Sequence, residues 1–239
     1  MTSAVRVKLS VMMFLNFFIW GAWLVTAATW FFEMEFTGPE VSRIYSTNAI
    51  AAIVAPFFIG MIADRFFPAQ VVLGVLHLLG AALLAYTSTL TSAGPIFWTL
   101  LAYSLCYMPT LALVNAIAFN KMENPDAEFP AIRVFGTLGW IVAGLLISFM
   151  LGRIFTDIDA TPWPMRMAAG ASLLLGIYSF LLPNTPPKST GKPVNMGDIL
   201  GLEALGLMRQ PHFAIFVVAS FLICIPLAFY YQMANPFLN

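Results

Sequence analysis

The distribution of charge along the chain is the feature that most constrains its fold. Long apolar blocks without Asp, Glu, Lys or Arg alternate with short polar segments, and several approach the ~20 residues with which a helix crosses the hydrocarbon core of a bilayer. Such blocks are Leu9–Phe32, Ile44–Ala63, Val134–Gly152 and Met167–Pro187. Charged residues make up 9% of the chain, whereas they are roughly a quarter of a soluble domain. The sequence therefore predicts a polytopic membrane protein.

A further block, Phe66–Asn120, is also free of these charges but is too long for one span. The segment from Ser88 to Pro95 interrupts it with Ser, Thr, Gly and Pro, which favour turns, so we expect a helix on each side. A last apolar block begins near Phe213. Because lipid offers no hydrogen-bond partner to the backbone, each span is predicted to be a helix. The expected fold is all-α with seven transmembrane helices.

A polar stretch between the sixth and seventh spans divides the chain. We predict an N-terminal six-helix bundle over residues 1–183, a cytoplasmic linker over 184–212, and a seventh transmembrane helix over 213–239. Within the linker, Asp198–Met208 is predicted to form a short amphipathic helix, because apolar residues recur there every three positions. Transporters often consist of two halves, so this arrangement predicts a chain that ends at the start of a truncated second half.

Lys and Arg are unevenly distributed among the polar segments. With the N-terminus inside, eight basic residues fall on the cytoplasmic side and only Arg43, Arg153 and Arg166 fall outside. This bias follows the positive-inside rule, and it predicts a multi-pass protein of the inner (cytoplasmic) membrane with a cytoplasmic N-terminus. The chain has no basic patch of the kind that binds nucleic acid.

Arg133 lies near the start of the fifth span, within the run from Pro130 to Trp140. A charge in a membrane helix is costly, and it usually marks a substrate path, an ion path or an ion pair. The ion-pair interpretation is that Arg133 counters Asp126 or Glu128. The residues alone slightly favour the ion pair over a role in a substrate or ion path.

The second span ends in the sequence from Gly60 to Arg65. Here glycine allows close packing, while Asp64 and Arg65 can pair with charges or helix ends of neighbouring segments. A charge pair at a helix end is common. Its position after the second span, however, resembles the loop motif of the major facilitator superfamily, which helps to hold the two halves in one conformation. The resemblance implies a gating role for Gly60, Asp64 and Arg65.

Longer segments resemble the nucleoside:proton symporter family within that superfamily. They are Phe18–Leu24, Tyr107–Leu113, Phe129–Gly139 and Asn235–Leu238, and they follow the family's order and spacing along nearly the whole chain. The resemblance implies a six-helix N-terminal major facilitator half followed by the first helix of the second half. It also implies secondary active transport, with nucleoside and protons as the transported partners. A carrier for another small polar solute, such as a sugar, is the alternative.

Carried over by this resemblance, the nucleoside site of the fifth span falls on Arg133, Thr137 and Trp140. Their i, i+4, i+7 spacing places them on one helical face. A guanidinium, a hydroxyl and a ring suit a nucleobase, whose carbonyls accept hydrogen bonds and whose face stacks. With the resemblance, the ligand role of Arg133 is favoured over the ion pair.

The seventh span departs from better-known members of the family. Where they carry a Gln and an Asn that face the substrate, this chain has Ala228 and Tyr231. Gln232 and Tyr230 are polar neighbours that can take their place. We therefore predict Tyr231 and Gln232 as substrate-binding residues of the seventh span.

Other polar or aromatic residues in the spans allow two interpretations. His77 could relay protons, but a hydrogen-bonded packing role is favoured. Trp20 and Trp23 could stack on a base or pack in the core. Small residues at helical spacing predict close helix contacts instead. They are Gly139 and Ala143 in the fifth span, and Ala168, Ser172 and Gly176 in the sixth.

Two other classes of membrane protein fit the sequence poorly. An intramembrane enzyme would need a serine-protease or H-E-x-x-H motif, and neither is present. His77 and His212 have no acidic neighbours at metal-ligand spacing, so no metal and no cofactor is predicted. A seven-helix receptor normally has an external N-terminus, which the distribution of Lys and Arg opposes. The sequence makes no prediction about the oligomeric state.

Overall fold

The computed structural model describes residues 1–154, 156–187 and 206–238, and within these ranges the regular structure is entirely helical. The α-helices are α1 (Ser3–Trp23), α2 (Ala27–Glu33), α3 (Gly38–Arg65), α4 (Ala69–Thr87), α5 (Ala93–Lys121), α6 (Pro125–Leu145), α7 (Trp163–Ser179) and α10 (Pro211–Leu238). A π-helical turn, Leu146–Leu151, extends α6, and 3-10 turns lie at Ile158–Ala160 and Leu207–Arg209. The all-α prediction is confirmed. Most of the amphipathic helix predicted at Asp198–Met208 lies outside the described residues.

The predicted membrane spans are also found. Six helical segments are long and apolar enough to cross a bilayer, with α1 and α2 together forming the first of them. Helix α7, at 17 residues, is slightly shorter, and it occupies the position of the predicted sixth span. With it, the described residues contain the seven spans that the sequence predicts.

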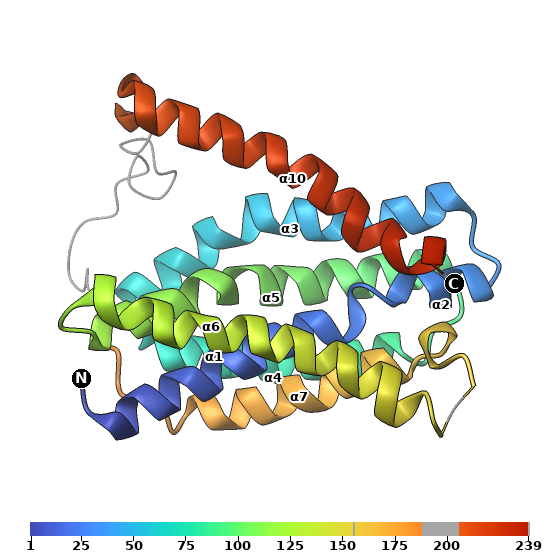
Figure 1. Cartoon of the computed structure of the whole chain (residues 1–239), viewed down its shortest axis with the longest axis horizontal. Helices are drawn as coiled ribbons and strands as arrows, with labels where there is room; N and C mark the ends of the chain where they lie inside the picture. The colour runs from blue at the N-terminus through green and yellow to red at the C-terminus, as the bar shows by residue number, and fades with distance from the viewer. Residues whose placement is uncertain (155, 188–205, 239) are drawn as a thin grey trace.

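The first six spans pack into one bundle, whereas α10 stands apart from it (Figure 1). In the bundle, α1 packs against α6 and α7, α4 against α5 and α7, and α3 against α5. Helix α10 diverges from the other helices at its beginning and approaches them only near its end, beside α2 (Figure 1). The predicted division into a six-helix bundle, a linker and a seventh helix stays a prediction.

Close contacts between helices depend on the small residues that the sequence singles out. A Cβ atom on Gly139 of α6 would collide with the carbonyl oxygen of Phe14 on α1. A Cβ on Gly176 of α7 would lie 2.9 Å from the side chain of Leu78 on α4. Ala143 and Ala168 are fully buried. The prediction of close packing at these positions is confirmed.

The first span is broken, which the sequence analysis does not predict. Helix α1 ends at Trp23 and α2 begins at Ala27, so backbone groups between them lose their helical partners. Tyr45 of α3 supplies replacements: its hydroxyl donates to the Leu24 carbonyl at 2.6 Å and accepts from the Ala28 N–H at 3.1 Å. A break in a membrane helix is tolerated where neighbouring side chains satisfy the backbone in this way.

A polar network lies inside the bundle around His77. One ring nitrogen is 3.1 Å from the Ser172 hydroxyl and the other is 3.0 Å from the Asn16 side-chain oxygen. The hydroxyl of Tyr107 donates to the Asn16 carbonyl at 2.7 Å. His77 is only 1% exposed. These contacts join α1, α4, α5 and α7, which is the packing role favoured for His77.

Candidate substrate site

The three predicted site residues of α6 lie in successive turns of the helix. Arg133 and Trp140 are half-buried, and Thr137 is exposed. The helix begins with Pro125 at its first position, where the missing N–H removes no helical hydrogen bond. Arg133 is therefore about two turns inside the helix, where its long side chain can reach toward either the bundle or the membrane boundary.

The guanidinium of Arg133 lies over an aromatic ring of α1. Its central carbon is 4.1 Å from the ring centroid of Phe17, a cation–π contact. Gly136 makes this conformation possible, because a Cβ there would lie 2.6 Å from one Arg133 nitrogen and 2.8 Å from the Phe17 ring. Sequence reasoning missed both Phe17 and Gly136, although the position of Gly136 one turn after Arg133 was a visible signal.

Glu128 in the first turn of α6 has another partner, and so has Glu123 just before the helix. The Met1 amino group is 3.1 Å from a Glu123 carboxylate oxygen and 3.4 Å from a Glu128 oxygen. The second Glu128 oxygen accepts from the Glu123 N–H at 3.2 Å. Across the described part of the chain, no carboxylate lies within ion-pairing distance of Arg133. The ion pair with Asp126 or Glu128, left open by the sequence, is therefore not formed.

Three rings from three helices meet next to this face of α6. Trp140 of α6 and Tyr231 of α10 have ring centroids 5.3 Å apart, and Trp20 of α1 is 5.8 Å from the first and 6.0 Å from the second. We call Trp20, Trp140 and Tyr231 the aromatic cluster. The Trp20 indole nitrogen is buried and has no hydrogen-bond partner among the described residues. The cluster thus combines flat apolar faces with an unused N–H donor.

A pocket lies beside the aromatic cluster, toward α2. Its volume is about 330 Å³, and Trp140, Thr26, Asp159 and Asn235 are among its lining residues. This size is at the lower end of the usual range for small-molecule sites. Trp140 therefore borders a real cavity as well as the other rings.

The end of α10 is attached to the bundle by amide side chains. Asn235 donates from Nδ2 to the Thr29 hydroxyl of α2 at 2.8 Å and to the Asp159 carboxylate at 3.2 Å. Gln232 donates to the Ser42 hydroxyl of α3 at 2.8 Å. We call these three hydrogen bonds the α10 latch. Gln232, predicted to bind substrate, is thus engaged with α3, whereas Tyr231 does join Trp140. Sequence reasoning missed Asn235, Thr29 and Asp159 as partners.

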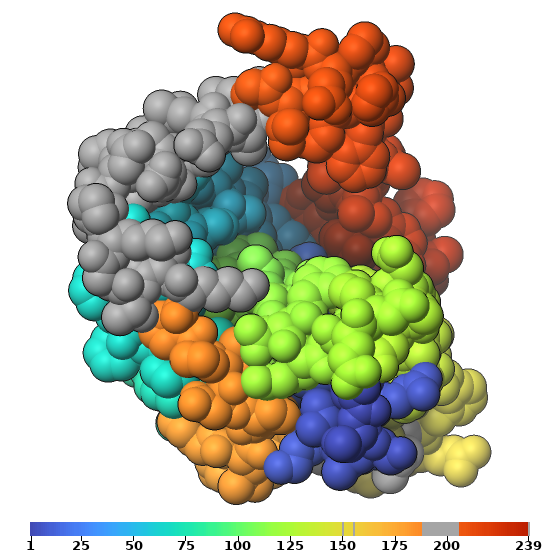
Figure 2. Space-filling view, turned by 90° about the vertical axis from the view of Figure 1, so that its left-hand side faces the viewer, coloured from blue at the N-terminus to red at the C-terminus, as the bar shows by residue number. Residues whose placement is uncertain are grey.

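The beginning of α10, unlike its end, is separated from the bundle. Seen from the end of the molecule where α1 begins, α10 is separated from α6 by a recess (Figure 2). Ile215, Phe216 and Phe221 near this end of α10 are all more than 60% exposed. The aromatic cluster and the α10 latch therefore lie toward the closed end of the space between α10 and the bundle.

The predicted gating residues lie at the end of α3 that is remote from the α10 latch. Arg65 is the last residue of the helix, and Ser42 is in its second turn. The close packing expected at Gly60 is not present among the described residues, because a Cβ there would have no atom within 4 Å.

In the described ranges, no group of three or more His, Cys, Asp and Glu could hold a metal ion.

Comparisons with known proteins agree in placing the chain. The family model described as nucleoside H⁺ symporter matches residues 3–239. The putative nucleoside transporter YegT of Escherichia coli (strain K12) is 48% identical over 97% of this chain and 55% of its own length. The xanthosine permease of the same organism is 34% identical over 99% of this chain and 56% of its own length.

Solved structures show the same similarity in three dimensions. The crystal structure of the nucleoside transporter NupG superimposes with a TM-score of 0.81 at 29% identity, covering 98% of this chain and 57% of that one. A peptide transporter, POT, at 16% identity and a TM-score of 0.59, shares the fold. The chain spans a little over half the length of the curated relatives that it matches. From its sequence and its fold, the chain belongs to the nucleoside H⁺ symporter family of major facilitator transporters.

Proposed function

We propose that the protein takes part in proton-coupled nucleoside uptake across the inner membrane, with its N-terminus in the cytoplasm. The observation that carries the proposal is the state of Arg133. It is held by Phe17 in a membrane helix, it has no carboxylate partner among the described residues, and Thr137 and Trp140 continue the same helical face. Such an arrangement leaves a charged donor available to a ligand. The family supports nucleoside as the ligand.

The roles of the side chains follow from nucleoside chemistry. Arg133 would donate to a carbonyl or ring nitrogen of the base, and Thr137 would add a weaker neutral hydrogen bond. Trp140 and Tyr231, whose rings lie 5.3 Å apart, would offer faces on which the base stacks. Because Trp140 belongs to the bundle and Tyr231 to α10, a ligand that stacks on this pair would contact both the bundle and α10.

The proton-coupling group is expected outside the first six spans. Their central turns contain no Asp or Glu, and a carboxylate is the usual proton carrier within a transporter's membrane region. The proposed orientation of the protein in the membrane rests on its Lys and Arg residues, of which eight fall on the inner side and three on the outer side.

The test is nucleoside binding by Arg133→Ala. Uridine and adenosine binding should be measured by calorimetry on the purified protein, including any sequence that its gene encodes beyond Asn239. Loss of a charged donor to a desolvated ligand weakens binding by about tenfold to a hundredfold. Thr137→Ala should weaken it less, and Trp140→Ala should affect uridine and adenosine alike, because stacking does not distinguish their edges.

Glu128→Gln is the matched control for charge. It removes a neighbouring charge without touching the Arg133 contact, so nucleoside affinity should stay at the wild-type value. A monosaccharide serves as the control ligand and should give no binding heat. Unchanged nucleoside affinity in Arg133→Ala, or equal losses in Arg133→Ala and Glu128→Gln, would contradict the proposed site.

A further inference from the structure

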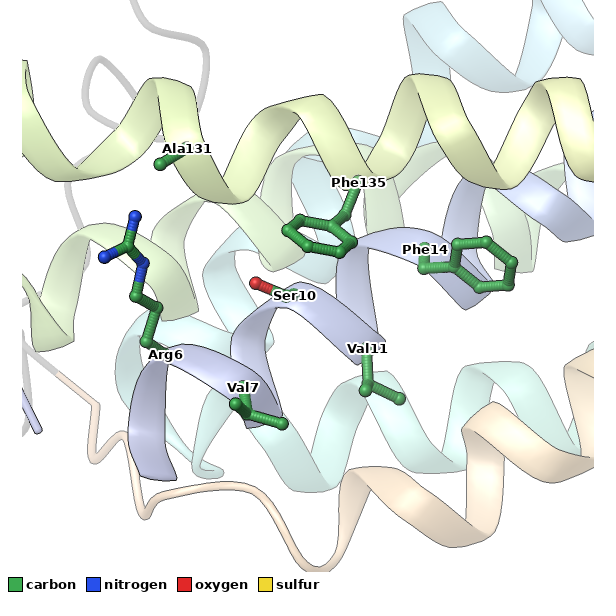
Figure 3. A pocket seen from close by; sticks show the side chains of 7 residues that line it. All are labelled: Arg6, Val7, Ser10, Val11, Phe14, Ala131 and Phe135. Carbon is green, nitrogen blue, oxygen red and sulfur yellow. The ribbon is translucent and has the colours of Figure 1, made fainter. Parts of the chain in front are cut away.

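A groove runs along the outer side of the seam between α1 and α6. Its volume is about 540 Å³, and its lining includes Arg6, Val7, Val11 and Phe14 from α1 with Ala131 and Phe135 from α6. These side chains follow one another from the start of α1 inward (Figure 3). Val7 is 62% exposed, so the groove is open to the surroundings of the bundle. It is separate from the aromatic cluster.

Arg6 is the charged residue of this groove, and it stands at one end, with Phe14 at the other (Figure 3). It has no ion pair or side-chain hydrogen bond among the described residues, whereas nearby charges are engaged. Lys8 donates to the Leu181 carbonyl at 2.9 Å. Glu123 and Glu128 hold the Met1 amino group. The groove therefore combines an apolar wall with one unpaired cation at its mouth.

The charged end of the groove lies near the start of α1, and its apolar end lies deeper along the helix. Arg6 is one turn from the start of α1 at Ser3, which places it at the boundary of the hydrocarbon. Phe14 lies eight residues further along, about 12 Å deeper at 1.5 Å per residue. Apart from the Arg6 guanidinium and the Ser10 hydroxyl, the groove is lined by apolar side chains, so it offers water few hydrogen-bond partners. Its natural occupant is an acyl chain.

We propose that this groove binds an anionic phospholipid, with its phosphate on Arg6 and an acyl chain along Val7, Val11 and Phe135. The preference for an anionic lipid follows from the guanidinium, whose planar fork of N–H donors fits phosphate oxygens. Basic pockets between membrane helices bind acidic headgroups by the same chemistry. The bound lipid would brace α1 against α6, the two helices that carry Phe17 and Arg133.

Lipid retention tests the proposal without reference to transport. The purified protein is mixed with phosphatidylglycerol or phosphatidylcholine in detergent, and bound lipid is counted by native mass spectrometry. We expect preferential retention of phosphatidylglycerol, and Arg6→Gln should reduce it about fivefold, the effect of one basic residue near an anionic headgroup. Arg209→Gln removes the same charge from an exposed turn outside the groove and should retain the wild-type preference.

A filling variant and a cross-link complete the test. Val11→Trp places bulk in the groove from a partly exposed position, so it should reduce retention of both lipids. A photoreactive amino acid at position 11 should cross-link to phospholipid in membranes. Equal retention by Arg6→Gln and Arg209→Gln would overturn the proposal. Cross-linking of position 11 to a second copy, or to a segment other than α1 and α6, would also overturn it, because protein would then fill the groove.

Discussion

The α1–α6 seam and the α10 contact are two ways of joining membrane helices, and they differ in what they permit. In the seam, Gly21 and Gly139 each face backbone atoms of the other helix, and Gly136 faces the Phe17 ring. Helix α10 instead touches the bundle through its last turns, at the aromatic cluster and the α10 latch. The first contact is continuous and depends on shape, whereas the second is local and depends on rings and amides.

This difference indicates which parts of the molecule can move relative to each other. Separating α1 from α6 would lose close packing along both helices, because dispersion contacts disappear as soon as a gap opens. Releasing the end of α10 would break three hydrogen bonds and expose rings that are already partly accessible. Alternating access in such carriers is a rocking of one body against another. The seam fits the inside of a body, and the α10 contact fits the boundary between two.

The largest expected effect is that of Gly139→Leu, which attacks the seam directly. A Cβ at this position would collide with the Phe14 backbone, and a backbone cannot move aside as a side chain can. Overpacking in a core costs about 1–3 kcal/mol, and we expect this variant to reach or exceed that range. The measurement is the melting temperature in detergent, together with the fraction of monodisperse protein in gel filtration.

Gly144→Leu is the control for this variant, because it lies on the same helix and a Cβ there meets nothing within 4 Å. Its melting temperature should stay close to that of the wild type. Similar melting temperatures for Gly139→Leu and Gly144→Leu would show that the seam tolerates separation, and the contrast with α10 would then lose its basis.

The sequence predicts the seam better than it predicts the α10 latch, for a physical reason. Small residues at i, i+4 spacing form a local pattern that can be recognised in a single sequence, because they lie on one face of the same helix. The α10 latch joins Asn235 to Thr29 and Asp159, which are more than 70 positions away. No local pattern indicates which of many polar residues face each other once the chain has folded.

In the candidate site, too, residues on one helix are easier to predict than contacts between helices. Arg133, Thr137 and Trp140 could be predicted because one helix and a family resemblance place them together. Phe17, which lies under Arg133, belongs to another helix. Gln232 stays a predicted site residue, and its contact with Ser42 of α3 could not be read from the sequence. The break after Trp23 was also missed, because Leu24, Val25 and Thr26 include no Gly or Pro. Its hydrogen bonds come from Tyr45, far along the chain.

Tyr45→Phe is expected to have an intermediate effect and tests the connection between the seam and the α10 latch. The change leaves the Leu24 carbonyl and the Ala28 N–H without the Tyr45 hydroxyl, and a buried unsatisfied polar group costs about 1–3 kcal/mol. The melting temperature should fall measurably, whereas Tyr86→Phe, at an exposed tyrosine, should leave it unchanged. An unaltered melting temperature in Tyr45→Phe would mean that other groups satisfy the break between α1 and α2.

Asn235→Ala is expected to have the smallest effect on stability, but it acts on the position of α10. It removes the hydrogen bonds to Thr29 and Asp159, worth about 0.5–1.5 kcal/mol each, while the bundle keeps its own packing. Spin labels on cysteines at Phe32 and Phe237, both exposed, report the distance between α2 and the end of α10. Both native cysteines are first removed by Cys106→Ser and Cys224→Ser. The distance distribution should broaden and shift to longer values in Asn235→Ala.

Gln232→Ala, which loses a single hydrogen bond to Ser42, should shift the distance distribution less. Identical distributions in the wild type and Asn235→Ala would show that the aromatic cluster and the Gln232–Ser42 hydrogen bond hold α10 in place without Asn235.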